Sequence, residues 1–382
     1  METELGYKYL FYGMFFVIAI SFSILINFLI LRFSSNLGMR DQGGGPGQVR
    51  WGLGSKPSLG GFSFYIIFLV SLSVLGVVGG GGGADGSYFN KQLIGLMAAS
   101  SLGFLIGLAD DAYNTNPLVK FIGQFTCANL LILTSYTIPV TESLEFNYIF
   151  TILWIIGLMN SINMLDNMDA ITSTVSITIL LGAMVLTLLN GTVDNSYIVI
   201  MLGVSGALIG FLFFNWHPSR MYMGDTGSQF LGVFLAAISI MFFWNIRTPY
   251  IGMFDLRQFI IPLLLFIIPL CDTGTVVIRR LARRQSPFVG GKDHIAHHLA
   301  YLGMSDTWVA VLLGSVSLAS VGIVMFIYPY YENDWNFGYT LLALGYFLAV
   351  FLIFQVLYQL GKRKQAARDR LRRIKAVKTA KV

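Results

Sequence analysis

The chain has 382 residues, of which 55% are hydrophobic and only 12% are charged, and its formal net charge at pH 7 is +6. Soluble domains carry roughly 25% charged residues, so this composition excludes an ordinary soluble protein and indicates an integral membrane protein. The apolar runs do not alternate with polar residues, as the strands of a membrane barrel would, so we expect an all-α, polytopic helical bundle. Cys127 and Cys271 both fall inside apolar runs, which indicates neither a disulfide framework nor a cysteine metal site.

Eleven apolar runs are long enough to cross a bilayer, which takes about 20 residues per helix. In chain order they cover residues 9–31, 58–79, 92–109, 118–138, 147–165, 173–190, 196–214, 228–245, 258–279, 306–328 and 337–360. The first run follows Glu2 and Glu4 rather than a basic cluster, so we interpret it as a retained span and not as a signal peptide. Glycine-rich stretches at 43–47 and 79–83 are predicted to be flexible loops.

Basic residues separate the two sides of this predicted bundle. Of the 25 Lys and Arg residues, only four fall on the side of the N-terminus: Lys8, Lys91, Arg247 and Arg257. The positive-inside rule therefore places the N-terminus outside and the opposite loops in the cytoplasm. We expect a transmembrane domain over 1–361 and a basic cytoplasmic tail over 362–382, whose charges favour anionic lipid rather than nucleic acid.

The first polar constellation is G-L-A-D-D-A-Y-N, which contains Asp110 and Asp111 at the end of the third span. Charged residues at this depth are costly and are therefore functional by default. Adjacent positions on a helix point about 100° apart, so the two carboxylates should serve different partners. A pair that only solvates the helix end is the alternative interpretation.

The second constellation, N-S-I-N-M-L-D-N-M-D, repeats polar residues every three positions, at Asn160, Asn163, Asp166 and Asp169. Neighbouring members share a helix face, but the face drifts over the whole run. We therefore predict that the helix ends or unwinds near Leu165, so that both aspartates turn toward one site. The asparagines are also compatible with a simpler role as hydrogen-bonding contacts between helices.

The third constellation is F-N-W-H-P-S-R-M-Y-M-G-D-T-G-S, in which Gly224 and Gly227 flank Asp225 and let the backbone approach a ligand closely. Thr226 and Ser228 add hydroxyl groups at the beginning of the next span, whose first amides favour anions. A carboxylate at such a place can hold a cation against a diphosphate. An ordinary glycine turn with a helix cap explains Asp225 but not the whole run.

Asp272 is a carboxylate inside the ninth apolar run, about two turns before Arg279 and Arg280. It needs a partner, which we expect to be one of these arginines or a metal site. Intramembrane acids also occur in transporters and channels, so transport is the competing class of function. A transporter would place such residues near the bilayer midplane on two matching repeats, whereas here they collect at one face and no repeat is visible.

The last polar constellation contains His294, His297 and His298 within the segment K-D-H-I-A-H-H-L. On a helix, these three side chains would cluster on one face. The spacing also suits zinc, but the segment lacks an intervening Glu and a nearby Cys. We therefore favour phosphate binding or proton transfer.

Taken in order, the segments resemble the polyprenyl-phosphate N-acetylhexosamine-1-phosphate transferase family, to which the phospho-N-acetylmuramoyl-pentapeptide transferases are related. The resemblance runs from about Gly54 to Asp306 and includes S-K-P-S-L-G-G, L-A-D-D, R-R-Q-S-P-F and the three constellations with Asn, Asp and His. It implies a bacterial inner-membrane enzyme whose site faces the cytoplasm. The implied substrates are a UDP-sugar, most often UDP-N-acetylglucosamine, and undecaprenyl phosphate, with Mg²⁺ as cofactor and Mn²⁺ as the alternative. UMP would leave, and a homodimer is left open.

The resemblance also implies roles for single residues. Asp225 and Asp111 would bind the metal. Asp110, Asp111, His294 and His297 would be catalytic. The implied substrate-binding residues are Lys56, Asn160, Asn163, Asp166, Asp169, Asn215 and His298. The histidine segment departs from the family pattern H-x-H-H-R, because Ala296 and His298 replace a His and the Arg, and an insert at 42–48 precedes Lys56. Direct attack by the acceptor phosphate and a two-step route through an aspartyl-phosphate both remain open. Asp41, Asp306 and Asp369 are set aside as ordinary loop charges.

Overall fold

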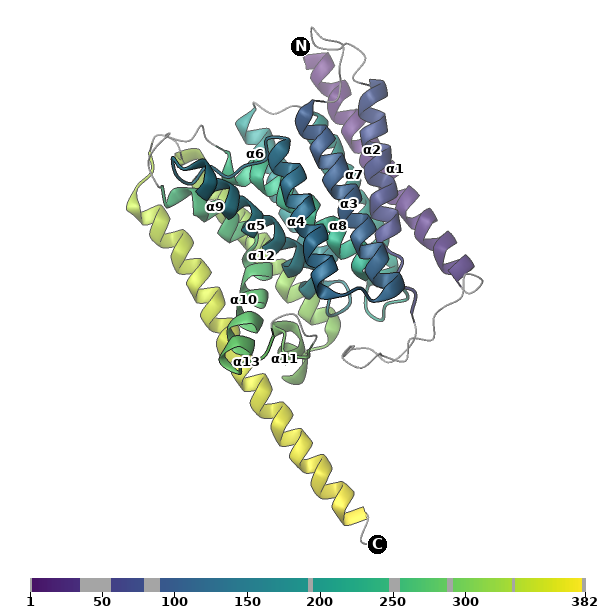
Figure 1. Cartoon of the computed structure of the whole chain (residues 1–382), viewed down its shortest axis with the longest axis vertical. Helices are drawn as coiled ribbons and strands as arrows, with labels where there is room; N and C mark the ends of the chain where they lie inside the picture. Colours follow the sequence, from purple (N-terminus) through teal and green to yellow (C-terminus); the bar gives the residue numbers. More distant parts are fainter. Residues whose placement is uncertain are drawn as a thin grey trace.

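The computed structural model describes residues 2–34, 56–78, 90–191, 195–246, 255–286, 291–331 and 334–379, which form a bundle of helices without strands among them (Figure 1). Both glycine-rich stretches, the insert at 42–48 and Asp41 lie outside these ranges. The elements are α1 (Glu2–Ser34), α2 (Gly61–Val78), α3 (Lys91–Tyr113), α4 (Pro117–Leu133), α5 (Leu144–Leu165), α6 (Ile171–Asn190), α7 (Asn195–Asn215), α8 (Gly224–Ser239), the π-helix η1 (Ile240–Trp244), α9 (Arg257–Leu265), α10 (Ile267–Ala282), α11 (Ile295–Tyr301), α12 (Asp306–Ile327), the short 3-10 helix η2 (Tyr328–Tyr330) and α13 (Phe337–Thr379).

Each predicted apolar run coincides with helix in the structure. Among the described residues, eight helices are long and apolar enough to cross a membrane, and the bent pair α9–α10 makes a ninth. The remaining two runs are the shorter apolar helices at Gly61–Leu75 and Pro117–Leu133. The prediction of an all-α, multi-pass membrane protein is thereby confirmed, while the number and direction of the crossings stay predictions.

The predicted span 258–279 is not one straight helix. Helices α9 and α10 meet at Phe266 with a bend of 87°. Pro269 falls in the first turn of α10, where its missing N–H would have no helical partner in any case. The bend therefore breaks a single apolar run into two helices.

Helix α8 is the most enclosed of the membrane-length helices, with 94% of its apolar stretch buried among its neighbours. Glycine permits this packing on two sides. A Cβ at Gly107 of α3 would collide with the backbone carbonyl of Asp225, and a Cβ at Gly232 would lie 2.6 Å from Cα of Met159 on α5. Small residues let helix backbones approach closely in membranes. The C-terminal halves of α3 and α5 are thereby held against α8.

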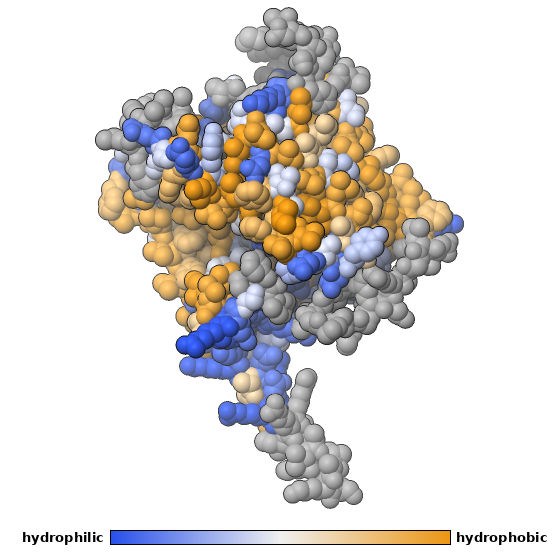
Figure 2. Space-filling model, in the orientation of Figure 1, coloured by the Kyte–Doolittle hydropathy of each residue, from blue (hydrophilic) through white to orange (hydrophobic). Residues whose placement is uncertain are grey.

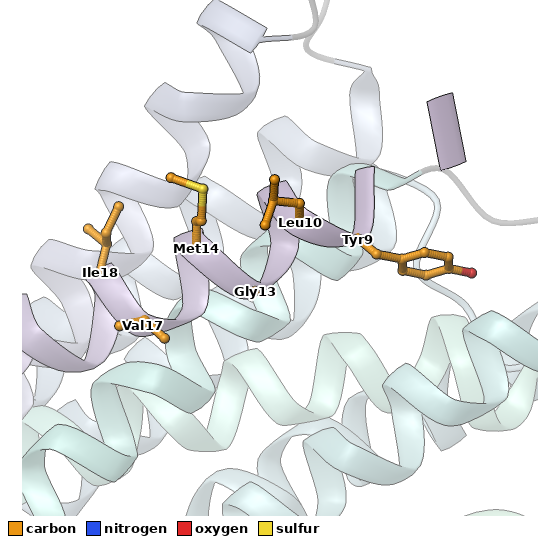
Figure 3. Close-up of a pocket in the computed structure, with 6 residues that line it drawn as sticks. All are labelled: Tyr9, Leu10, Gly13, Met14, Val17 and Ile18. Atoms are coloured by element: carbon orange, nitrogen blue, oxygen red, sulfur yellow. The ribbon is translucent and has the colours of Figure 1, made fainter. Parts of the chain in front are cut away.

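The outer surface is apolar in a broad band, and charged residues gather below it on α13 (Figure 2). Figure 3 shows an apolar hollow on one side of α1, lined by Tyr9, Leu10, Gly13, Met14, Val17 and Ile18. Such a surface is expected where a helix faces lipid. None of the polar residues selected from the sequence lines it. Helix α11 and the C-terminal part of α13 lie at the same end of the bundle (Figure 1).

Candidate active site

The described polar residues meet where α3 and α5 end and α4 and α8 begin. The chain reverses direction between α3 and α4 because Asn114 adopts a left-handed conformation, with φ of 50°. Asn116 then caps α4 with its side chain, and Pro117 occupies the first turn. This short connection brings the first turn of α4 back beside the last turn of α3.

Lys120 lies between two carboxylates of this site. Its Nζ atom is 2.7 Å from Oδ2 of Asp110 and 3.3 Å from Oδ2 of Asp225. The other oxygen of Asp110 accepts hydrogen bonds from N and Oγ1 of Thr115, at 2.9 and 2.6 Å. Asp225 is the most open of the three charged side chains, with 34% of its area exposed against 11% for Asp110 and 17% for Lys120. Asp110 is therefore fully engaged, and Asp225 retains access to a ligand.

Sequence reasoning did not select Lys120. The signal that identifies it is its position as a lone charge within the apolar run P-L-V-K-F-I-G, where a charge is costly unless it is used. Asp110 lies 10 residues before it and Asp225 lies 105 residues after it, so no single motif links the three. Only the packing of α3, α4 and α8 joins them into one group.

Asn163 binds the carboxylate oxygen of Asp225 that Lys120 does not contact. Its Nδ2 atom donates to Oδ1 of Asp225 at 2.6 Å and to Oγ of Ser228 at 2.8 Å. The two oxygens of Asp225 thus face an amide and an ammonium group. The structure brings Asn163 into the predicted site, and its contact with substrate stays a prediction.

Asp111 caps helix α8. Its Oδ1 accepts from the backbone N–H of Asp225 at 3.0 Å, and its Oδ2 accepts from N and Oγ1 of Thr226 at 2.8 and 2.6 Å. A carboxylate at a helix N-terminus satisfies unpaired amides and interacts favourably with the helix dipole. The expectation that the two adjacent aspartates serve different partners agrees with this geometry. Both oxygens of Asp111 are engaged within the protein, and its assignment as a metal ligand stays a prediction.

A second layer of polar residues lies one helical turn deeper on the same three helices. Nε2 of Gln124 on α4 donates to Oε1 of Gln229 on α8 at 3.0 Å, and the amide groups of Gln124 and Asn160 hydrogen-bond each other at 2.9 and 3.3 Å. Asn160 therefore joins helices by hydrogen bonds, the simpler of its two interpretations. This layer ties together the three helices that carry Lys120, Asn163 and Asp225.

Helix α5 ends at Leu165, as predicted, and Asp166 follows in the turn. Burial and, next, the nearby negative charge of Asp225 together raise the pKa of Asp166 to about 7. Carboxylates that disfavour one another's ionisation in this way attract a cation. The turn ends at Ala170, whose φ is 67° and whose N–H donates to Oδ1 of Asn215 at 2.9 Å.

The side-chain amide of Asn215 hydrogen-bonds to the backbone through both its oxygen and its nitrogen. Its Nδ2 atom donates to the carbonyl of Met221 at 3.0 Å while its Oδ1 binds Ala170, and the residue is only 4% exposed. It thus holds the turn after α5 against the loop after α7. Both polar atoms of this side chain thus contact the backbone, and its role in substrate binding stays a prediction.

Asp169 belongs to a neighbouring polar group. Its carboxylate lies 3.0 Å from Nδ1 of His217 and accepts from N and Oγ of Ser219 at 3.1 and 2.8 Å. Nζ of Lys56 in turn donates to Oγ of Ser219 at 3.0 Å. Asp306, set aside as an ordinary loop charge, lies 3.5 Å from the same nitrogen of His217. That interpretation of Asp306 is wrong, because the beginning of α12 packs beside this group.

Asp272 has a different partner from the two arginines that its sequence position suggested. Its Oδ2 is 2.8 Å from Nδ1 of His294, and its Oδ1 accepts from N of Ile295 at 2.7 Å, at the beginning of α11. Arg280 instead binds Asp293 through two hydrogen bonds of 2.9 and 2.7 Å. These contacts join α10 to the segment that carries the histidines.

The three histidines do not share one face of a helix, because His294 precedes α11. The rings of His294 and His297 remain close, with centroids 5.5 Å apart, whereas the ring of His298 packs on Tyr358 of α13 at 3.7 Å. The backbone of Asn167 lies beside His297, so this histidine connects α11 to the turn that carries Asp166. His294 and His297 are thus grouped, and His298 faces a different helix.

Burial lowers the pKa of His297 to about 3 and that of His298 to about 4. The next largest cause is the nearby charge of His294 for His297 and of Arg279 for His298. Histidines in the unfolded chain have a pKa near 6.5. Between pH 6.5 and the folded pKa values, the unfolded chain therefore binds more protons than the folded chain. Stability is therefore expected to fall as the pH falls from 7 to 5, by about 2 kcal/mol for each of the two residues at pH 5.

Thermal unfolding of the purified protein at pH 7 and pH 5 measures this loss. His298→Gln, which cannot take up the proton, should show a clearly smaller decrease in Tm between the two pH values. An equal decrease in both proteins would contradict the assignment.

Among the described residues, no three His, Cys, Asp or Glu side chains are arranged to hold a metal ion. This is compatible with Mg²⁺, which is commonly bound by one or two carboxylates together with substrate phosphates and water. Asp225 is accessible, and Asp166 lies within its electrostatic reach. The oxygen donors of the site therefore fit a hard cation better than zinc.

Residues 93–243 match the family described as glycosyl transferase family 4. The chain is 29% identical over 299 residues to a probable undecaprenyl-phosphate N-acetylglucosaminyl 1-phosphate transferase of Bacillus subtilis, covering 76% of this chain and 77% of that protein. It is 26% identical to a decaprenyl-phosphate N-acetylglucosaminephosphotransferase of Mycobacterium leprae, covering 71% and 72% of the two chains. It is 25% identical to a phospho-N-acetylmuramoyl-pentapeptide-transferase of Listeria welshimeri, covering 82% and 96%. The matched range contains Asp110, Lys120, Asn163 and Asp225.

Proposed function

We propose that this chain, which matches glycosyl transferase family 4 over residues 93–243, transfers N-acetylglucosamine 1-phosphate from the UDP-sugar to undecaprenyl phosphate, releasing UMP. The observation that carries the proposal is the convergence of Lys120 and Asn163 on the two oxygens of Asp225, at the N-terminus of α8. The names of the relatives support the same reaction class. The product would be a lipid diphosphate-sugar that begins a cell-surface glycan, and the site would face the cytoplasm of a bacterium.

The reaction brings two anions together, so its main obstacle is charge repulsion. An oxygen of the acceptor phosphate attacks the sugar-linked phosphorus, and the bond from that phosphorus to the oxygen of UMP breaks. The acceptor phosphate is already ionised near neutral pH and needs little assistance from a base. The protein must position the two phosphates and compensate their charge, to which a buried lysine can contribute.

Asp225 would hold Mg²⁺, with Asp166 as a further carboxylate within electrostatic reach. When bound, the ion would supply charge neutralisation of the donor diphosphate. Lys120 orients Asp225 and Asp110 through its two ion pairs, and Asn163 fixes the second oxygen of Asp225. We place His294 and His297 near the donor, because Asp272 holds the former and the latter lies beside the Asp166 turn. The geometry favours no aspartyl-phosphate, since Asp225, the more accessible of the two carboxylates that Lys120 contacts, already binds two side chains.

Incubation of the purified protein with undecaprenyl phosphate and separate UDP-sugars tests the proposal. UDP-N-acetylglucosamine should give UMP and a lipid diphosphate-sugar identified by mass spectrometry, and removal of Mg²⁺ with a chelator should stop the reaction. Asp225→Asn serves as the matched inactive protein. Absence of a lipid-linked sugar with every donor would contradict the proposed function, and uptake of a solute into vesicles would favour transport instead.

A further inference from the structure

Helix α13 does not end with the membrane domain at residue 361. It continues without interruption from Phe337 to Thr379, and its middle part packs against α11 at the end of the bundle where α10 and α11 lie (Figure 1). Nζ of Lys364, beyond the boundary predicted from the sequence, donates to the carbonyl of Leu302 at 2.6 Å. The C-terminal helix therefore contacts the histidine-bearing segment directly.

The closest contact between the two helices requires glycine. A Cβ added at Gly361 would collide with the backbone carbonyl oxygen of His298 and lie 3.0 Å from its carbonyl carbon. Because this neighbour is backbone rather than a flexible side chain, α11 would have to shift as a unit. Gly345 lies on the same helix, about 24 Å before Gly361 at about 1.5 Å per residue. A Cβ added at Gly345 would meet no other atom within 4 Å.

A stack of three side chains holds the same contact. The ring of Tyr358, only 1% exposed, lies 3.7 Å from the ring of His298 and 3.8 Å from the guanidinium of Arg279 on α10. Gln355, one turn before Tyr358, accepts from Arg279 at 2.6 Å and donates to Oγ1 of Thr275 at 2.6 Å. Tyr358 thus lies between the histidine segment and α10.

Helix α11 has seven residues, which is far too short for an isolated helix to be stable in water. Tertiary contacts must therefore order it. Asp272 accepts a hydrogen bond from its first residue, Ile295. Gly361 and Tyr358 pack against its fourth residue, His298. His297 lies between these two supports.

We propose that Tyr358 and Gly361 of α13 are positioning residues for the active site, which act by fixing α11 and with it His294 and His297. The proposal rests on the proposed function for its kinetic consequence, because these histidines are placed near the donor diphosphate. The C-terminal helix is then part of the site and not a separate tail. His298 is a packing residue of this contact rather than a substrate ligand.

Gly361→Ala tests the proposal, with Gly345→Ala as the matched control. We expect Gly361→Ala to raise the KM for the UDP-sugar about tenfold, with a smaller change in the KM for undecaprenyl phosphate. Hydrogen exchange of residues 295–301, measured without substrates, should become faster in this variant alone. Gly345→Ala should match the wild type in both measurements. Equal behaviour of the two variants would overturn the proposal.

Tyr358→Leu and Tyr358→Phe separate the ring from general packing. The leucine variant should show the same higher donor KM and faster exchange of α11 as Gly361→Ala. The phenylalanine variant keeps the stacked ring and should match the wild type in both measurements. If both variants behave like the wild type, Tyr358 does not position α11. If the wild type itself transfers no sugar, the proposed function fails, while the exchange measurements still decide whether α13 orders α11.

Discussion

Replacing Lys120 by methionine is expected to lower kcat about 100- to 1000-fold, the loss typical of removing one preorganised charged group from an active site. The ammonium group now lies 2.7 Å from Asp110 and 3.3 Å from Asp225. Without it, two neighbouring carboxylates would repel each other, and the site would lose a cation beside the donor phosphates. UMP release by the purified variant measures the effect.

Lys91→Met is the control for this substitution, because Lys91 is exposed at the beginning of α3. It should retain wild-type activity. Lys120→Arg keeps the charge but changes its geometry, so it should recover only part of the lost rate. Activity of Lys120→Met within about threefold of the wild type would remove Lys120 from the mechanism, since positioned charges contribute far more than this.

Asp111→Asn is expected to destabilise the protein by about 2–3 kcal/mol, because a carboxylate that accepts three hydrogen bonds is replaced by a group with one acceptor oxygen. The affected amides are those of Asp225 and Thr226 at the beginning of α8. The amide nitrogen of the new side chain would face one of these donors. A lower Tm in detergent measures the loss of the cap.

The same variant distinguishes capping from metal binding. If Asp111 acts as a cap, the surviving activity should depend on Mg²⁺ concentration as in the wild type. Asp369→Asn, at an exposed position of α13, should leave both Tm and the Mg²⁺ dependence unchanged. An unchanged Tm together with a severalfold higher Mg²⁺ requirement would instead identify Asp111 as a metal ligand.

Much of the architecture follows from the sequence because hydropathy acts locally. An apolar run of about 20 residues must become a helix in lipid, so the helical regions can be read without tertiary information. The end of α5 at Leu165 was predictable for a similar reason, since a three-residue repeat cannot stay on one face of a helix. The bend at Phe266 was not, because the apolar run continues across Phe266 and only packing shows where the two helices separate.

The sequence by itself determined which residue types gather at one end of the bundle: the aspartates and asparagines of α3, α5 and α8, and the histidines before and within α11. Tertiary structure decided what each of them contacts. Lys120 pairs with Asp110 and Asp225, Asp111 caps α8, Asp272 holds His294, and His298 packs on Tyr358. These partners are separated by up to 115 residues, as between Asp111 and Thr226. Helix periodicity constrains neighbours within a few turns, and the contacts between helices depend on glycine positions and side-chain shapes that act only once the bundle has packed.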